Sequence, residues 1–203
     1  MHRYDFESAN YHLENPVEKE IWSKRVKQTV AKSWVIKTQS LIPLYHGLRY
    51  LNYKDFWPGK VHPLLKIKKS SREMTRIPVK LKMLTGTYLL QHMRSKIYAK
   101  ETGDLCMACE EESETLEHLI LECEAYEHIK TPILEKIKHI IFYACSVTWD
   151  DLTPQVHIQL IMDITKIHKE LKIPKQALEC IEFETRRLLY LIHGARGKIL
   201  LNK

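Results

Sequence analysis

Three cysteines and one histidine stand close together near the middle of this 203-residue sequence, at a spacing that suits a metal ion. They are Cys106, Cys109, His118 and Cys123, in the pattern C-x2-C-x8-H-x4-C. Zinc is held tetrahedrally by four nitrogen or sulfur donors, and two cysteines separated by two residues can place both thiolates on one ion from a tight turn. The pattern therefore predicts a site for one Zn²⁺.

The predicted site is structural and not catalytic, because four protein ligands leave the ion no open position for water or a substrate. The alternative interpretation is three buried cysteines and one core histidine that are neighbours by chance, since free cysteine is often buried. His118 and Cys123 stand five residues apart, which is about 140° around an ideal helix. Both can reach one ion only if one of them lies at a helix end or if the helix is distorted.

The elements that would position these ligands are mostly helical, because glycine is scarce and apolar residues recur at helical spacing. We expect a mainly α fold, an irregular helical bundle with a small zinc-binding insertion between helices. We divide the chain into a helical, aromatic-rich segment (residues 1–75), a zinc-binding helical region (76–145) and a C-terminal helical pair (146–203).

Helix ends follow from capping signals. Asn15 and Pro16 predict the start of one helix, with Trp22 and Trp34 packed in the core, although both could also stack on nucleobases. Thr115 predicts the cap of the helix that carries His118. Thr131 followed by Pro132 predicts the cap and first residue of the next helix.

Charge is strongly segregated along the chain, which has a formal net charge of +7. The basic segment (residues 60–100) contains a single acid, Glu73, and such single-sign density favours a polyanionic partner over a solvated face. We therefore predict that it binds the phosphates of RNA or DNA. The predicted contact residues are Lys66, Lys68, Lys69, Arg72, Arg76, Lys80, Lys82, Arg94 and Lys96.

The charge then reverses, because ten acids and no lysine or arginine lie between Glu101 and Glu127. These carboxylates would repel a phosphate backbone. We expect the metal loop to fix the basic helix before it against the helix after it, and not to grip nucleic acid itself.

The number and spacing of the cysteines predict the cellular compartment, and the lengths of the apolar runs bear on membrane contact. The five cysteines form an odd set with a C-x2-C pair, which favours a reducing, intracellular setting, nuclear or cytoplasmic, over a disulfide framework. No apolar run approaches the length of a membrane span, so no membrane partner is expected.

The sequence also resembles a known family. The run from Val79 to Arg94, followed by the Cys-x2-Cys pair, by Glu114-Thr115-x-x-His118 and by Cys123, is similar to the C-terminal region of non-LTR retrotransposon polyproteins, especially those of marine invertebrates. The likeness extends from about Ile77 to Arg196. In that family the region follows the reverse transcriptase and carries a CCHC zinc-binding motif.

The resemblance implies four metal ligands, a role in holding RNA or DNA, and association with the rest of a reverse transcriptase polyprotein. The chain departs from that polyprotein because it contains no Tyr-x-Asp-Asp polymerase motif and no recognisable endonuclease. It also departs from the short retroviral knuckle, which has four residues before the histidine and a glycine and aromatic that this chain lacks. Base stacking in the manner of that knuckle is therefore not expected.

Two other functions compete with a non-catalytic nucleic-acid-binding module. A zinc-stapled protein-interaction scaffold, as a decayed or host-reused element, would dock a partner on the acidic face. A nucleobase deaminase would need H-x-E followed by P-C-x2-C. His12-Leu-Glu14 precedes the cysteine pair, but Leu105 stands where the proline is required. We therefore expect no catalytic activity.

Overall fold

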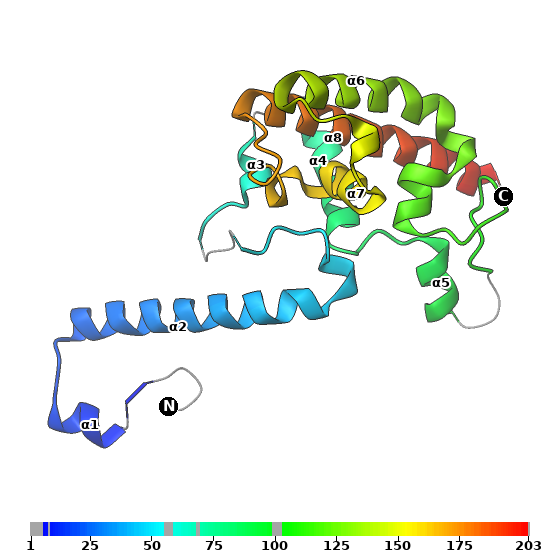
Figure 1. The fold of residues 1–203 in the computed structure, drawn as a ribbon. Helices are drawn as coiled ribbons and strands as arrows, with labels where there is room; N and C mark the ends of the chain where they lie inside the picture. The colour runs from blue at the N-terminus through cyan, green and yellow to red at the C-terminus, as the bar shows by residue number, and fades with distance from the viewer. Residues whose placement is uncertain (1–5, 8, 55–58, 68–69, 99–102, 203) are drawn as a thin grey trace.

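The computed structural model describes residues 6–7, 9–54, 59–67, 70–98 and 103–202, and these residues form a mainly α structure (Figure 1). This confirms the predicted fold class. The described residues form no β-strand, only one isolated bridge between Leu105 and Ser113. The α-helices are α1 Ala9–Glu14, α2 Lys19–Leu41, α3 Pro63–Lys66, α4 Glu73–Leu84, α5 Gln91–Ile97, α6 Glu127–Cys145, α7 Pro154–Asp163 and α8 Lys175–Asn202.

Short helical turns connect these helices. Among the described residues, five are 3-10 turns, and one is a π-helical turn just before Cys123. They are η2 Ile42–Leu44, η3 His46–Leu48, η4 His118–Glu122 (the π turn), η5 Glu124–Tyr126, η6 Trp149–Asp151 and η7 Ile164–Lys166. No described helix is both long enough and apolar enough to cross a bilayer.

The helical body is built around α8, which α6 flanks along its length while α4 and α7 pack below (Figure 1). Isoleucines of α6 at a helical spacing, Ile133, Ile137 and Ile141, are buried together with Ile181 and Leu188 of α8. Such spacing places them on one face of each helix. One buried core results, and it extends from Tyr50 to Ile192. The predicted three-part division stays a prediction, and this core crosses both of its boundaries.

Buried charges also join α4 to α8. Lys80 is 1% exposed, and its Nζ donates to Glu182 Oε2 at 2.7 Å and to Thr185 Oγ1 at 2.8 Å. Arg186 donates to Glu182 at 2.8 Å and to Glu73 at 3.2 Å. Burial lowers the pKa of Lys80, while Glu182 acts in the opposite direction. A charge buried in this way needs its partner, so these contacts fix how α4 lies on α8.

The helix α2 differs from the body because it extends away from the other helices (Figure 1) and buries only Val35. The prediction that Trp34 packs in the core was wrong, since it is 48% exposed. Trp22 contacts the rings of Phe6 and His12 at centroid distances of 5.7 and 4.6 Å. Trp22 and Trp34 do lie on a helix as predicted, but no described element of the body covers most of the side of α2 on which they stand.

Two predicted helix starts were displaced. The helix predicted from Pro16 begins at Lys19, after Glu18 in an extended conformation. The helix predicted from Pro132 begins five residues earlier, at Glu127, and contains Pro132 in its second turn. Because Pro132 is the sixth residue of α6, it lies beyond the first four N–H groups that lack a helical partner, and it removes one hydrogen bond of the helix, the one to the carbonyl of His128.

Candidate metal centre

The four predicted ligands meet at one point. Their ligand atoms, the three Sγ atoms and one imidazole nitrogen, all lie within 4.8 Å of one another. Cys106 Sγ and Cys123 Sγ are 3.8 Å apart, and Cys109 Sγ lies 3.3 Å from His118 Nε2. A tetrahedron with Zn–S bonds of about 2.3 Å has sulfur–sulfur edges of about 3.8 Å. The donor set and spacing therefore fit one tetrahedral ion, and the sulfurs are too far apart for a disulfide.

The cysteine pair is positioned by a small hairpin within the metal loop (residues 104–123). The Cys106 N–H donates to the carbonyl of Glu112 at 2.7 Å, and the Glu114 N–H donates to Asp104 at 2.8 Å. Between them, Glu110 takes a left-handed conformation with φ of 61° and donates its N–H to the carbonyl of Cys106 at 2.8 Å. This turn brings the two thiols of the C-x2-C pair to the same side of the hairpin.

The other two ligands come from the chain just after the hairpin. Thr115 caps this segment as predicted, because the His118 N–H donates to Thr115 Oγ1 at 3.1 Å. The Cys123 N–H then bonds the carbonyl of His118 at 2.7 Å across a π turn. Such a turn closes from residue i to i+5 and so widens the helix. The helix is thus distorted, and Cys123 also lies just past its end. These are the two alternatives by which His118 and Cys123, five residues apart, were predicted to reach one ion.

Glu112 orients the histidine ligand, a role the sequence did not reveal. Its carboxylate lies 2.9 Å from His118 Nδ1, which leaves Nε2 turned toward the sulfurs. A carboxylate on the far nitrogen of a metal-bound histidine fixes the ring and its tautomer. Glu112 is one of several acids in this stretch, and no local signal separates it from its neighbours.

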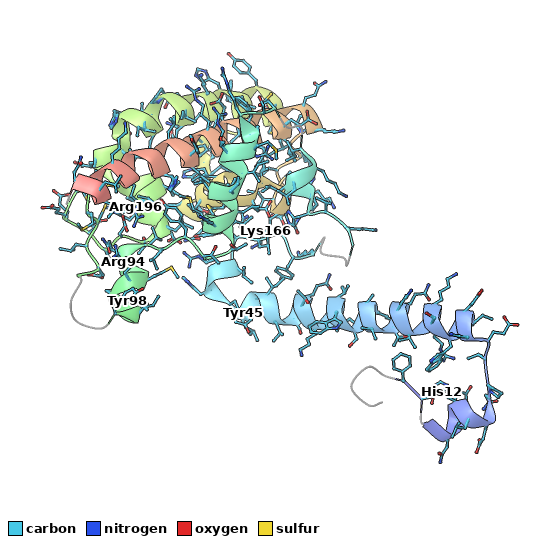
Figure 2. The ribbon with its side chains drawn as sticks, turned by 180° about the vertical axis from the view of Figure 1, so that it is seen from behind. His12, Tyr45, Arg94, Tyr98, Lys166 and Arg196 are labelled. Carbon is cyan, nitrogen blue, oxygen red and sulfur yellow. The ribbon has the colours of Figure 1, made fainter. Side chains whose placement is uncertain are left out.

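The metal loop is anchored to the body by one buried acid. Glu114 is fully buried, and its two carboxylate oxygens each accept a 2.7 Å hydrogen bond from Arg196 of α8. The Gln91 N–H at the start of α5 donates to the same carboxylate at 2.7 Å. Figure 2 shows Arg196 on α8 and Arg94 on α5 from behind. One carboxylate therefore connects the hairpin to two helices.

The three thiols differ in acidity. Burial raises the pKa of Cys123 to about 12 and raises that of Cys106. Burial also acts upward at Cys109, but hydrogen bonds from the backbone N–H groups of Glu111 and Glu112 and from His118 outweigh it and lower the pKa to about 7. Because metals bind thiolates, metal binding near neutral pH would displace protons from Cys106 and Cys123.

The predicted phosphate contacts are spread over the surface and not gathered at the metal centre. Lys66, Arg72, Lys82 and Lys96 are exposed. Arg76 and Arg94 are half-buried, and Arg76 pairs with Glu73 at 2.9 Å and lies over the ring of Phe183. Lys68 and Lys69 lie outside the described residues.

The prediction for Lys80 was wrong. Its ammonium group is enclosed in the body and bonded to Glu182 and Thr185, so it cannot contact a phosphate. Lys80 stands three residues after Ile77 and so lies near the apolar face of α4, but this spacing does not reveal the distant acid, Glu182, that pairs with the buried charge.

Comparisons with protein-family models, with curated proteins and with solved structures find no match for this chain. The resemblance to retrotransposon C-terminal regions therefore stays a prediction. What the fold adds is the metal-ligating geometry and the distribution of charge.

Proposed function

We propose that this chain is a non-catalytic, zinc-stabilised module that binds RNA or DNA mainly through the phosphate backbone. The metal part of the proposal is supported by the four convergent donors at Cys106, Cys109, His118 and Cys123. Three thiolates and an imidazole are ligands that zinc prefers. Because four protein ligands complete a tetrahedron, the site has a structural role and supplies no activated water.

The observation that best supports nucleic-acid binding is the burial of Glu73 and its pairing with arginines. It is the only acid of the basic segment, and it is 1% exposed and paired with Arg76 and Arg186. The exposed surface of this segment is therefore cationic without a competing carboxylate of its own. Phosphate contact by several such cations, with release of condensed counterions, is the main source of affinity in sequence-independent binding.

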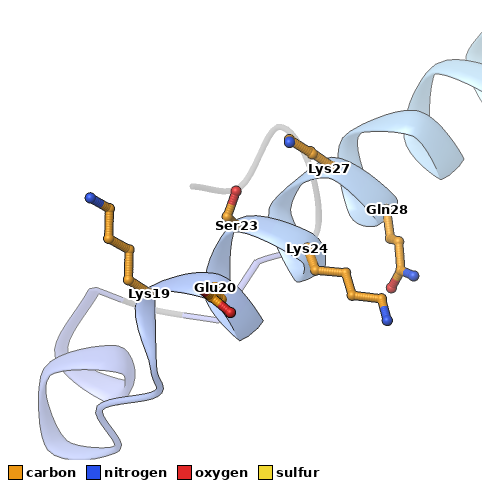
Figure 3. A pocket seen from close by; sticks show the side chains of 6 residues that line it. All are labelled: Lys19, Glu20, Ser23, Lys24, Lys27 and Gln28. Carbon is orange, nitrogen blue, oxygen red and sulfur yellow. The ribbon is translucent and has the colours of Figure 1, made fainter.

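The helix α2 extends the positive surface. Within Lys19–Leu41 the only acid is Glu20, whereas six lysines and arginines are present and exposed. Figure 3 shows three of these cations, Lys19, Lys24 and Lys27, extending from the shallow hollow at the N-terminal half of the helix. A hollow formed on a single helix encloses no ligand, so we assign it a contribution of charge and not a binding site.

A second function, a protein-interaction scaffold, is favoured by a different observation. The helix α2 buries only Val35 and leaves Ile21, Trp34 and Ile36 about half exposed at different sides of the helix, so apolar side chains along it are available for contact with a protein surface. The resemblance implies one such surface, the rest of a reverse transcriptase polyprotein. The two functions are compatible if α2 docks onto protein while the basic segment holds nucleic acid.

Salt dependence tests the leading proposal. Fluorescence anisotropy would follow a labelled RNA strand and a DNA duplex over a salt series, with wild type and the triple variant Lys66→Gln/Arg72→Gln/Lys82→Gln. Each lost phosphate contact should flatten the slope of log affinity against log salt, by about 0.9 on duplex DNA and about 0.7 on single strands.

A control variant that loses the same number of positive charges elsewhere separates the effect of lost phosphate contacts from the effect of a lower net charge. Lys136, Lys169 and Lys175 are exposed and lie outside the basic segment, so Lys136→Gln/Lys169→Gln/Lys175→Gln should keep a slope close to wild type. Equal flattening by both triple variants would contradict a contact surface in the basic segment. Absence of salt-dependent binding by wild type would contradict nucleic-acid binding and leave the scaffold function.

A further inference from the structure

A cleft of about 620 Å³ lies beside the metal loop, between the chain that follows α2, the turn after α4, the helix α5 and the start of η4. Its volume is in the range of ligand-binding clefts. Four of its lining residues are apolar: Met83, Leu90, Met93 and Leu116. Four others carry a basic or imidazole side chain: His46, Arg49, His92 and Lys96.

Two glycines hold the wall of the cleft together. Gly86 has φ of +67°, and a Cβ atom at this position would lie 2.7 Å from the Cα of Gly47. Any larger residue at position 86 would therefore collide with backbone and adopt a strained conformation. The two backbones meet directly, which brings the His46–Leu48 turn against the turn after α4. Both segments therefore contribute to the lining of the same cleft.

The charge inside the cleft is positive. Glu117 is the one carboxylate among the described lining residues, and it already bonds Arg49 and the hydroxyl of Tyr50. Burial, followed by the hydrogen bond to Glu117, raises the pKa of Tyr50 to about 12, so its hydroxyl stays a neutral donor. Glu117 thus offsets Arg49, and Lys96 adds a positive charge at the exposed side.

We propose that this cleft holds one unpaired nucleotide of a single-stranded segment, an inference that rests on the proposed nucleic-acid binding. An apolar lining with cations matches a flat base attached to a phosphate. Within a duplex both faces of a base are stacked and its edge is paired, so an unpaired base enters such a cleft without the unstacking and unpairing cost of a few kcal/mol that a paired base would incur. The metal loop contributes Thr115 and Leu116 to the wall, so the structural ion and the strand-binding site are neighbours.

The test compares single and double strands of equal length, using one cation of the cleft and one outside it. Lys96→Gln should weaken binding of an unstructured RNA or DNA strand by about 10-fold and leave duplex binding close to wild type. Lys82→Gln, an exposed cation of α4 outside the lining, should weaken both to a similar degree. Equal losses by Lys96→Gln on both substrates would overturn the cleft inference while keeping the proposed function.

A change in the apolar lining gives a readout that does not depend on charge. Contact of a base with the apolar Met93 side chain would bury roughly 40 Å² and contribute about 1 kcal/mol, or about 5-fold in affinity, so Met93→Gln should lower single-strand affinity by about 5-fold with duplex affinity unchanged. Met93→Leu, of similar volume, should bind as wild type. Circular dichroism and metal content of both variants would exclude unfolding. An unchanged affinity of folded Met93→Gln for single strands would overturn the proposal.

Cross-linking locates the nucleotide directly. A strand containing 4-thiouracil should cross-link to peptides that include residues 83–96 or 46–50, and to fewer of them in Met93→Gln. Cross-links confined to α2 or to residues 60–82 would overturn the cleft inference, and no binding of any strand by wild type would overturn the proposed function instead. Competition by nucleoside monophosphates alone at micromolar concentration would assign the cleft to a free mononucleotide and overturn the strand inference.

Discussion

The helical body and the metal loop are stabilised by different means. The body, formed by α3, α4, α6, α7 and α8, encloses an extended apolar core with isoleucine and leucine side chains that are almost fully buried. The hairpin of the metal loop, from Asp104 to Glu114, folds mainly through backbone hydrogen bonds, the cysteine pair and the Glu114–Arg196 contact, whereas Leu119 and Ile120 of the same loop belong to the apolar core. Segments with so little apolar area need a metal or other cross-link to hold one conformation. The comparison leads us to expect that the four candidate ligands, once they hold a metal, substitute for a core in this hairpin.

The two regions also treat charge in opposite ways. The body places Lys80, Glu182, Arg186 and Glu73 inside, each with a partner. The metal loop keeps most of its acids at the surface, among them Glu111 and Glu122. Buried pairs fix geometry and are costly to break singly, whereas exposed acids mostly set the local potential. Changes in the two regions should therefore produce different kinds of effect.

The largest effect is expected from removing the metal. Chelation, or Cys106→Ser, should release one zinc per chain and unfold the metal loop, because structural zinc contributes about 10–16 kcal/mol of apparent binding free energy. Elemental analysis and hydrogen exchange would show metal loss together with faster exchange in residues 104–123, while α6 and α8 stay protected.

Cys180→Ser is the matched control, because Cys180 is exposed and outside the cluster, and it should keep the metal. Protein purified under reducing conditions that contains no metal and takes none up on titration would contradict the site. Equal loss of protection in α8 would contradict the separation of the two regions.

The next effect is expected in the body. Lys80→Met removes the buried ammonium and leaves Glu182 paired with Arg186 but without its hydrogen bond from Lys80, so the free energy of unfolding should fall by about 1–3 kcal/mol. Urea unfolding followed by circular dichroism measures this change.

The control in the same helix is Lys82→Met, an exposed position, which should change the free energy of unfolding by no more than about 0.5 kcal/mol. Metal content should be unchanged in both variants. A small effect of Lys80→Met would show that the buried pair does not stabilise the contact between α4 and α8.

A smaller effect links the surface acids to the metal. Glu112→Gln keeps the size of the side chain but weakens its bond to His118 Nδ1, so metal affinity should fall by about 10- to 100-fold. Competition with a chromophoric chelator measures the affinity. Glu111→Gln, an exposed neighbour, should bind metal as wild type does. Equal affinities for the two variants would remove Glu112 from the orienting role.

Local patterns predicted much of this molecule, and long-range pairing escaped them. The four ligands, the Thr115 cap and the distortion before Cys123 all follow from spacing within 18 residues. The contact that allows Lys80 to be buried joins it to Glu182, about 100 positions away, and the Glu114–Arg196 contact joins residues 82 positions apart. A charged side chain is assigned to the surface unless its partner is known, and a sequence alone does not pair charges at that distance.

The exposed face of α2 escaped prediction for a related reason. Trp22, Val26, Val30 and Trp34 recur every four residues along one side of α2, but this periodicity shows only that the side is apolar and does not show what covers it. In the structure Trp34 faces outward, and only Val35 of this helix is buried. The extent of the body could therefore be predicted from α4 onward better than before it.

The smallest expected effect concerns the sign of charge in the two regions. Neutralising the exposed acids Glu111 and Glu124 should leave nucleic-acid affinity unchanged or raise it by no more than about 2-fold, because repulsion between exposed charges that are not in contact is weak in water and is further screened by salt. The slope of log affinity against log salt should stay as in wild type, since no phosphate contact is lost. Lys66→Gln/Arg72→Gln changes the same number of charges with the opposite sign and should flatten the slope. If the acid variant weakened binding while the basic variant did not, the metal loop would be the contact surface and the electrostatic argument would fail.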